Sequence, residues 1–281
     1  MDQPKYLFVM GCRKSGTTWL QSLLDSHPNI MCCNEGLFHA FGRRLAQVVG
    51  HYNKALDSKI KIFGERTFPN FGREEFQVLF RNFVVERLRR EALHEGSKNL
   101  IYHGEKDPNH VLQPEVLMDC FPDARFIHII RDGRDVAVSW WHHMIRYDEE
   151  RVKRNNRQFG QVAMNGAREW SKDVRKVREQ QARTGVAFHE LRYEALLEDP
   201  EKTLTAMFEF LDVPRTKEIV AKCLEETSFA KMSGGRTPGE EDKSSFYRKG
   251  VKGDWRNHMT EEQSQAFIQA SSGVMQELGY A

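Results

Sequence analysis

The sequence lacks an excess of charge of either sign, since 42 basic residues stand against 40 acidic ones in 281, a formal net charge of +2. A nucleic-acid-binding protein carries a strong basic excess, so we expect no nucleic-acid partner, and any anion site must be local. The chain also has no apolar run that approaches the roughly 20 residues a membrane span needs. We therefore expect no membrane partner.

Cysteine is scarce, with five residues at irregular spacing: Cys12, Cys32, Cys33, Cys120 and Cys223. An odd and irregular set fits neither a disulfide framework nor a zinc site. We expect reduced thiols and a cytoplasmic protein. The first twelve residues, MDQPKYLFVMGC, are not typical of a secretory signal, and the sequence shows no internal repeat or low-complexity tract.

The hydrophobic residues, 40% of the chain, are enough for a folded core. Short apolar runs predict strands at residues 6–10, 30–33, 100–103, 126–130 and 186–191. Helical spacing predicts helices at residues 17–26, 74–94, 136–145 and 204–211. Strands that alternate with helices favour a central parallel sheet flanked by helices. We predict an α/β protein with a single domain over residues 1–281.

One long polar segment, SGGRTPGEEDKSS at residues 233–245, is rich in glycine. Such a segment is typical of a linker or of a mobile lid. Because Trp255 lies in a folded-looking element after it, we favour a lid.

Residues 6–19 have the order strand, glycine loop, helix. Such a loop directs backbone N–H groups at one point, and the helix N-terminus adds partial positive charge. Lys14 supplies a full charge there, and Thr17 and Thr18 supply hydroxyl donors. An ordinary tight turn between strand and helix is the alternative, but the lysine and the hydroxyl cluster favour a phosphate site.

This loop differs from the metal-dependent nucleotide-binding pattern, in which Lys and then Ser or Thr directly follow the second glycine. Here Thr17 follows Gly16, and Lys14 precedes that glycine by two positions. The strand at residues 126–130 ends in Arg131 and not in an acidic metal ligand. The pattern therefore predicts an anion site without a metal.

Three motifs carry a family resemblance: GCRKSGTTWL at residues 11–20, IIRDGRDVAVSWW at 129–141 and FYRKGVKGDW at 246–255. They resemble the 5'-phosphosulfate loop, the 3'-phosphate motif and the C-terminal signature of cytosolic sulfotransferases. RYEALLEDP and ETSFAKM also fit that branch. The resemblance implies the P-loop-like sulfotransferase fold. It also implies transfer of a sulfuryl group from 3'-phosphoadenosine 5'-phosphosulfate (PAPS) to a small-molecule hydroxyl or amine, with adenosine 3',5'-bisphosphate (PAP) as product.

The resemblance implies a set of donor-binding residues. These are Arg13, Lys14, Ser15, Gly16, Thr17, Thr18, Trp19, Arg131, Ser139, Tyr193, Thr227, Ser228, Phe229, Met232, Arg248, Lys249 and Gly250. Trp19 and Phe229 offer flat faces for an adenine, although core packing is the usual role of such residues.

For the transfer step, Lys14 is the candidate to stabilise the leaving phosphate oxygen, and Ser139 is expected to hold Lys14 until substrate is present. Lys106 is the candidate for the sulfuryl group. The cytosolic branch places a histidine base two residues after this lysine, where this chain has Pro108.

Four residues are candidates to replace that base: Glu35, His110, Glu105 and His103. GEKDP resembles the lysine motif of tyrosylprotein sulfotransferases, in which a glutamate follows the phosphate loop at the spacing of Glu35. We favour Glu35 and expect burial to raise its pKa. The alternative is a glutamate in a first helical turn, capped by Asn34.

The acceptor cannot be read from the sequence. Candidates to line its pocket are Phe38, His39, Phe41, Trp140, Trp141, His142, His143 and Tyr147. The family's dimer motif is missing, since Glu261 follows Thr260 where valine is usual, so the oligomeric state stays open. A magnesium-dependent kinase and a non-catalytic nucleotide-binding protein are the rival functions.

Overall fold

The computed structural model describes residues 4–64, 68–94 and 99–281. The strands are β1 (Lys5–Met10), β2 (Ile30–Asn34), β3 (Tyr102–Lys106), β4 (Arg125–Ile130) and β5 (Ala187–Arg192). The longer helices are α1 (Thr17–Asp25), α2 (Phe38–Phe63), α3 (Arg73–His94), α5 (Gly133–Arg154), α6 (Phe159–Thr184), α8 (Pro200–Leu211), α9 (Lys217–Glu226) and α11 (Glu261–Ala270). Short helices are η1 (Pro108–Leu112), α4 (Pro114–Cys120), α7 (Tyr193–Glu198), α10 (Phe229–Ser233), η2 (Asp254–Asn257) and α12 (Val274–Glu277).

All five strands form one parallel sheet in the order β2-β3-β1-β4-β5. β1 is the central strand, with Phe8 opposite Glu105 on one side and opposite Phe126 on the other. The predicted α/β architecture is confirmed. From β1 the chain passes to the edge strand β2, returns through β3 beside β1, and continues on the other side with β4 and β5. The chain thus changes sides at β1, and the crevice at the carboxyl ends there is where such a sheet binds ligands.

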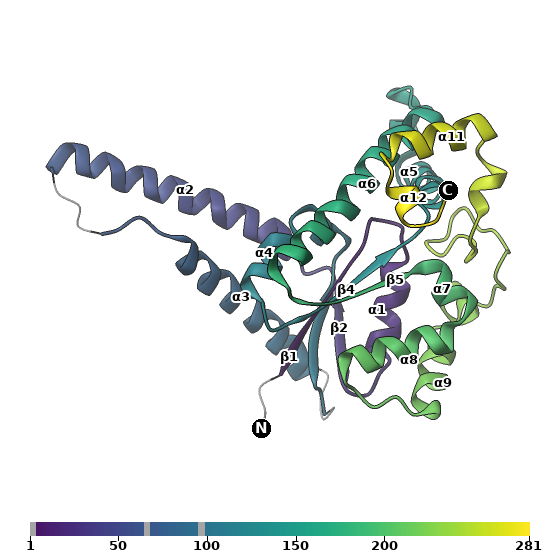
Figure 1. Cartoon of the computed structure of the whole chain (residues 1–281), viewed down its shortest axis with the longest axis horizontal. Helices are drawn as coiled ribbons and strands as arrows, with labels where there is room; N and C mark the ends of the chain where they lie inside the picture. Colours follow the sequence, from purple (N-terminus) through teal and green to yellow (C-terminus); the bar gives the residue numbers. More distant parts are fainter. Residues whose placement is uncertain (1–3, 65–67, 95–98) are drawn as a thin grey trace.

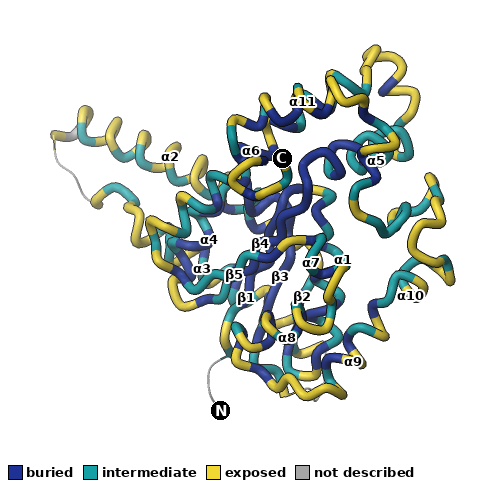
Figure 2. Tube along the Cα trace, turned by 45° about the vertical axis from the view of Figure 1, so that its right-hand side comes forward, coloured by how far each residue is buried: buried dark blue, intermediate teal, exposed yellow. Residues whose placement is uncertain are grey.

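Side-chain alternation along β1 divides the core into two layers. Leu7 and Val9 pack with α1, α8 and α9 on one face of the sheet. Phe8 and Met10 pack with α3, α4 and α6 on the other face. Figure 2 shows the strands as the most buried part of the molecule. A third cluster joins α5, α6, α11 and α12 around Trp170 and holds α5 against α6.

Helix α3 packs against the sheet, and α2 pairs with α3 and extends away from the sheet (Figure 1). The helix α2 was not predicted, although its apolar residues recur at helical spacing. Val48 and Ile62 on α2 are 63% and 67% exposed. Among the described residues, no helix is long and apolar enough to cross a membrane.

Strand β3 covers Tyr102–Lys106, whereas the sequence predicts residues 100–103. The prediction ends too early because Glu105 and Lys106 are buried at the end of the strand despite their charge. Gly104 permits close packing here, since a Cβ would lie 3.0 Å from the carbonyl oxygen of Leu7. This difference matters because Lys106, the catalytic lysine candidate, is the last residue of β3 and lies at the carboxyl end of the sheet.

Residues 234–253 form an irregular segment between α10 and η2, so the glycine-rich stretch has no regular secondary structure. Arg236 stabilises it by donating hydrogen bonds to the carbonyl oxygens of Glu240, Tyr247 and Arg248. Its role as a lid stays a prediction.

Candidate active site

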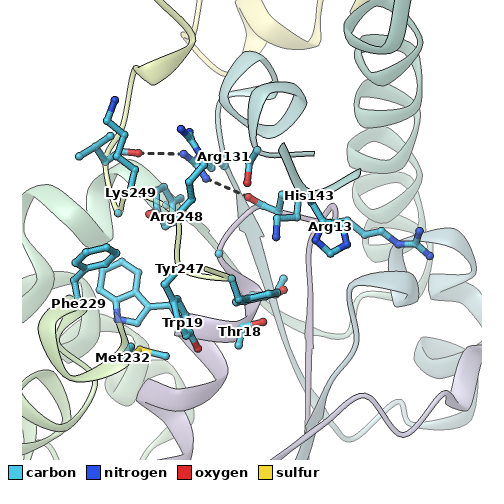
Figure 3. Close-up of a pocket in the computed structure, with 18 of the residues that line it drawn as sticks. Arg13, Thr18, Trp19, Arg131, His143, Phe229, Met232, Tyr247, Arg248 and Lys249 are labelled. Atoms are coloured by element: carbon cyan, nitrogen blue, oxygen red, sulfur yellow. Dashed lines mark hydrogen bonds between the residues drawn. The ribbon is translucent and has the colours of Figure 1, made fainter. Parts of the chain in front are cut away.

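A pocket of about 720 Å³ opens at the carboxyl ends of the strands. The loop between β1 and α1, the first turns of α5, and residues 227–252 supply most of its walls. Figure 3 shows Trp19, Phe229 and Met232 at one end and Arg13 and His143 at the other. The pocket therefore joins the predicted phosphate loop to an aromatic end and a basic end.

The phosphate loop has a backbone that ordinary residues rarely adopt. Lys14 has φ of 72° and Gly16 has φ of 94°, which is the left-handed region that favours glycine. A Cβ on Gly16 would lie 2.5 Å from the Tyr193 ring, so glycine is required there. Ser15 is fully buried and does not line the pocket, and its hydroxyl has no partner.

The Lys14 ammonium lies in a strongly positive environment. Burial, together with the nearby charges of Arg146, Arg131 and Arg248, lowers its pKa to about 8. Lys14 Nζ lies 4.3 Å from the centroid of the Phe246 ring. The predicted contact of Lys14 with Ser139 is wrong for this state, because no hydrogen bond joins these two described residues. Ser139 does line the pocket.

Arg131 begins the segment after β4 and lines the pocket beside the loop. Its guanidinium donates to the carbonyl oxygens of Lys14 at 3.3 Å and Val251 at 3.1 Å and lies 4.5 Å from the Tyr193 ring centroid. Its buried Nε has no hydrogen-bond partner. Arg131 thus ties the phosphate loop to the C-terminal segment and keeps donor capacity for an anion.

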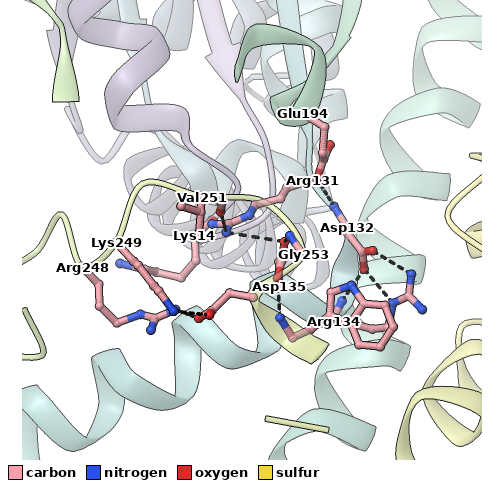
Figure 4. A network of polar contacts seen from close by, with 12 residues as sticks. Lys14, Arg131, Asp132, Arg134, Asp135, Glu194, Arg248, Lys249, Val251 and Gly253 are labelled. Carbon is pink, nitrogen blue, oxygen red and sulfur yellow. Dashed lines mark hydrogen bonds and ion pairs between the residues drawn. The ribbon is translucent and has the colours of Figure 1, made fainter. Parts of the chain in front are cut away.

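Two acidic residues that sequence reasoning missed organise the C-terminal segment (Figure 4). Asp254 pairs with Arg248 at 2.5 Å and with Lys249 at 2.6 Å. Burial raises the pKa of Asp254, but the hydrogen bonds from Lys249, Arg248 and Asn257 outweigh it and hold that pKa well below its usual range. Asp135 accepts from the backbone amides of Gly253 and Trp255 at 2.6 and 2.9 Å. The GDW letters of the C-terminal motif were the available signal for Asp254.

The aromatic end of the pocket is built around Trp19. Its indole N–H donates to the carbonyl oxygen of Thr227 at 3.0 Å, which fixes the ring beside Phe229 and Met232. Gly250 packs on this end, since a Cβ there would lie 2.4 Å from the Phe229 ring. Ser228 instead caps α10 and does not line the pocket.

Lys106 reaches across the end of the sheet. Its Nζ lies 3.0 Å from Glu35 Oε1 and 3.5 Å from Thr18 Oγ1. Glu35 lines the pocket, but the expectation of burial is wrong, because its side chain is 43% exposed. The helical alternative is also wrong, because Asn34 ends β2 and α2 begins only at Phe38.

The other three base candidates do not line the pocket. Glu105 and His110 are fully buried and hydrogen-bonded to each other, and Glu105 also accepts from the Gly36 amide at 2.7 Å. Burial alone would lower the pKa of His110, but the carboxylates of Glu105 and Asp107 outweigh it and raise that pKa. His103 lies near the opposite end of β3, next to Tyr6 on β1.

Of the eight residues suggested for the acceptor pocket, only Trp140 and His143 line it. The other six, Phe38, His39, Phe41, Trp141, His142 and Tyr147, lie in the core or on other surfaces. Lining residues that were not suggested are Pro108, Asn109, Leu197, Pro238, Phe246, Tyr247, Val251 and Lys252. Aromatic composition alone could not separate them, because core and pocket use the same residue types.

Outside the pocket, three side chains come close enough to hold a metal ion. One ligand atom each of His39, Asp107 and His110 lie within 4.8 Å of one another. His39 Nδ1 lies 3.0 Å from Asp107 Oδ2, so a hydrogen bond already uses this pair. The prediction that no metal takes part stays a prediction.

Comparisons with known proteins agree with the motifs. The profile described as "Sulfotransferase family" matches residues 4–217. Human sulfotransferase 1E1 is 30% identical over 200 residues, 65% of this chain and 67% of the human protein. Cytosolic sulfotransferase 1 of Arabidopsis thaliana is 27% identical over 162 residues, 50% of this chain and 46% of that protein.

Solved structures show the same fold. Mouse sulfotransferase SULT7A1 superposes with a TM-score of 0.57 at 19% identity, covering 98% of this chain and 86% of that one. Sulfotransferase STF9 of Mycobacterium avium gives 0.53 at 15% identity, covering 99% and 77%. Because the family profile matches well over half of the sequence, this chain belongs to the sulfotransferase family.

Proposed function

We propose that the chain transfers a sulfuryl group from PAPS to a hydroxyl or amine of a small-molecule acceptor, by in-line transfer that needs no metal. One observation carries the proposal: a single pocket joins the Lys14 loop, the basic residues around Arg248, and the aromatic end at Trp19. The mouse SULT7A1 structure is described as complexed with PAP. This supports the same nucleotide as donor product here.

In this proposal the adenine lies between Trp19 and Phe229. The 3'-phosphate lies against Arg131, Ser139 and Arg248, and the phosphosulfate lies on the loop at Lys14. Donor binding exchanges protein ion pairs for phosphate contacts, since Arg248 is paired with Glu241 and Asp254 in the structure.

The transfer step replaces one bond to sulfur with another. The acceptor oxygen or nitrogen forms a bond to sulfur while the bond from sulfur to the bridging phosphate oxygen breaks. The negative charge that develops on the leaving phosphate oxygen is stabilised by Lys14, and Lys106 stabilises the sulfuryl oxygens. The acceptor proton goes to the Glu35 carboxylate, which lies 3.0 Å from Lys106 Nζ.

The test is transfer of ³⁵S-labelled sulfuryl from PAPS to a panel of phenols, alcohols and amines after exhaustive chelation. We expect labelled products and PAP in equal amounts, with Lys14→Ala and Lys106→Ala strongly impaired. If chelation abolishes turnover and magnesium restores it, the metal-free proposal is wrong. Absence of transfer combined with phosphoryl transfer from ATP and magnesium would favour the kinase alternative.

A further inference from the structure

The end of the pocket opposite Trp19 is the end that the proposed donor leaves open. It is lined by Arg13, Glu35, Pro108, Asn109, Trp140 and His143. Figure 3 shows Arg13 extending away from the aromatic end. With the adenine at Trp19 and the phosphosulfate on the loop, an acceptor that reaches Glu35 must contact these residues.

Arg13 is a guanidinium held in place by neutral groups. Its Nε donates to Asn109 Oδ1 at 3.0 Å, and a second nitrogen donates to the same oxygen. The Asn109 backbone N–H and side-chain amide both donate to Asp107 Oδ1 at 2.8 Å, which fixes the side chain. The guanidinium carbon lies 5.8 Å from the Trp140 ring centroid. The guanidinium is thus oriented without being neutralised, which suits capture of a carboxylate.

Arg146 on α5 is a second cation near this end; it lies behind the lining residues His143 and Phe246 and does not itself line the pocket. It donates to His143 Nδ1 at 3.1 Å and lies 5.7 Å from the Phe246 ring centroid. Burial lowers the pKa of His143, and the charges of Lys14, Arg146 and Arg13 lower it further. The lowered pKa favours the neutral imidazole, which accepts the hydrogen bond from Arg146 without compensating its charge.

Carboxylates are distributed unevenly in this pocket. At the donor side, Arg248 and Lys249 have Asp254 as a partner. At the open end, Glu35 is the only acid that lines the pocket, and it pairs with Lys106. Within the described part of the chain, neither Arg13 nor Arg146 forms a direct ion pair with a carboxylate, and Asp173 lies close enough to be influenced by the charge of Arg13. The open end consequently carries positive charge that no direct ion pair balances.

We propose that the acceptor is an anionic phenol, a molecule whose aromatic ring carries the hydroxyl to be sulfated and, at its other end, a carboxylate. The carboxylate binds Arg13 and Arg146, and the ring packs against Trp140 and Phe246. This inference names the acceptor class for the proposed function and rests on it. The transfer itself is unchanged: the phenol oxygen bonds to sulfur, its proton goes to Glu35, and PAP leaves.

Three phenols of one shape and different charge test the proposal: 4-hydroxyphenylacetate, 4-hydroxyphenylacetamide and tyramine. Each is titrated by calorimetry into protein saturated with PAP, and kcat/KM is measured with PAPS. We expect the acid to bind and react at least about tenfold better than the amide, and tyramine to be poorest. Arg13→Gln and Arg146→Gln should each reduce the advantage of the acid over the amide, compared in each variant at saturating PAP or PAPS.

Arg151→Gln is the matched control, because Arg151 is an exposed arginine on the same helix and does not line the pocket. It should keep the full preference for the acid. Equal use of acid and amide, no binding of the acid to the PAP-loaded protein, or a preference that survives both variants would overturn the inference. Those results leave PAP binding intact, whereas failure of PAP itself to bind would remove the proposed function and this inference together.

Discussion

The Glu35 carboxylate lines the pocket and lies 3.0 Å from the buried Lys106 ammonium. Glu35→Gln keeps the shape of the side chain and removes its basicity. We expect turnover to fall by roughly 100-fold or more while PAP affinity stays nearly unchanged. Steady-state rates and calorimetry measure the two effects. Glu150→Gln, an exposed glutamate on α5, serves as control, and near-normal turnover in Glu35→Gln would place the base elsewhere.

Lys14 makes donor binding dependent on pH. Its pKa is lowered to about 8, first by burial and then by neighbouring arginines, and a bound phosphate would favour the charged form and raise that pKa. The affinity for PAP should therefore be full below about pH 8 and fall by up to about tenfold per pH unit above it. Dissociation constants between pH 7 and 10 measure this. Lys14→Arg should flatten the profile, because arginine stays charged; an equally flat profile in the unmodified protein would contradict the assignment.

Among the elements, the turn at Gly250 supports the aromatic end. Gly250 has φ of 65°, and a Cβ would lie 2.4 Å from the Phe229 ring. Gly250→Ala should displace that ring and weaken PAP binding by about tenfold or more, since stacking on an aromatic side chain is worth about 1–3 kcal/mol per base. Gly234→Ala is the matched control, because Gly234 has φ of 78° with no atom within 4 Å of its Cβ position. If Gly250→Ala and Gly234→Ala bind PAP equally well, the contact of residue 250 with Phe229 does not support PAP binding, and any loss of affinity comes from backbone strain.

The segment at residues 233–245 is the second element with a testable role. Its glycines Gly234, Gly235 and Gly239 have open surroundings, and the segment leads into Arg248, a proposed donor contact. We expect hydrogen exchange in this segment to slow when PAP binds, while exchange in α8 stays the same. Equal protection with and without PAP would refute the lid.

At the scale of the whole molecule, local patterns predicted the sheet and the phosphate loop because both depend on short apolar runs and on glycine placement. They predicted α3, at residues 74–94, but missed α2, which leaves apolar residues such as Val48 and Ile62 exposed. Nor could they separate the base candidates in GEKDPNH. Side chains alternate along a strand, so Glu105 joins His110 in the core while Lys106 reaches Glu35 in the pocket.

The sequence also did not predict which charged residues form ion pairs. Arg248 and Lys249 were predicted as a phosphate site, but their balance by Asp254 and Glu241 depends on the three-dimensional path of residues 241–254. The positive end at Arg13 and Arg146 combines a loop and a helix that lie far apart in the chain. Single-domain organisation over residues 1–281 and the oligomeric state stay predictions.

The central claim is a donor site that reads a 3'-phosphate, and calorimetry with matched nucleotides tests it most directly. PAP should bind far more tightly than adenosine 5'-phosphate or ATP with magnesium, because Arg131, Ser139 and Arg248 contact the group that the other two lack. Arg248→Ala should weaken PAP by about 1.5–3 kcal/mol and leave adenosine 5'-phosphate nearly unchanged. Equal affinities for PAP and adenosine 5'-phosphate, with no effect of Arg248→Ala on either, would contradict the account.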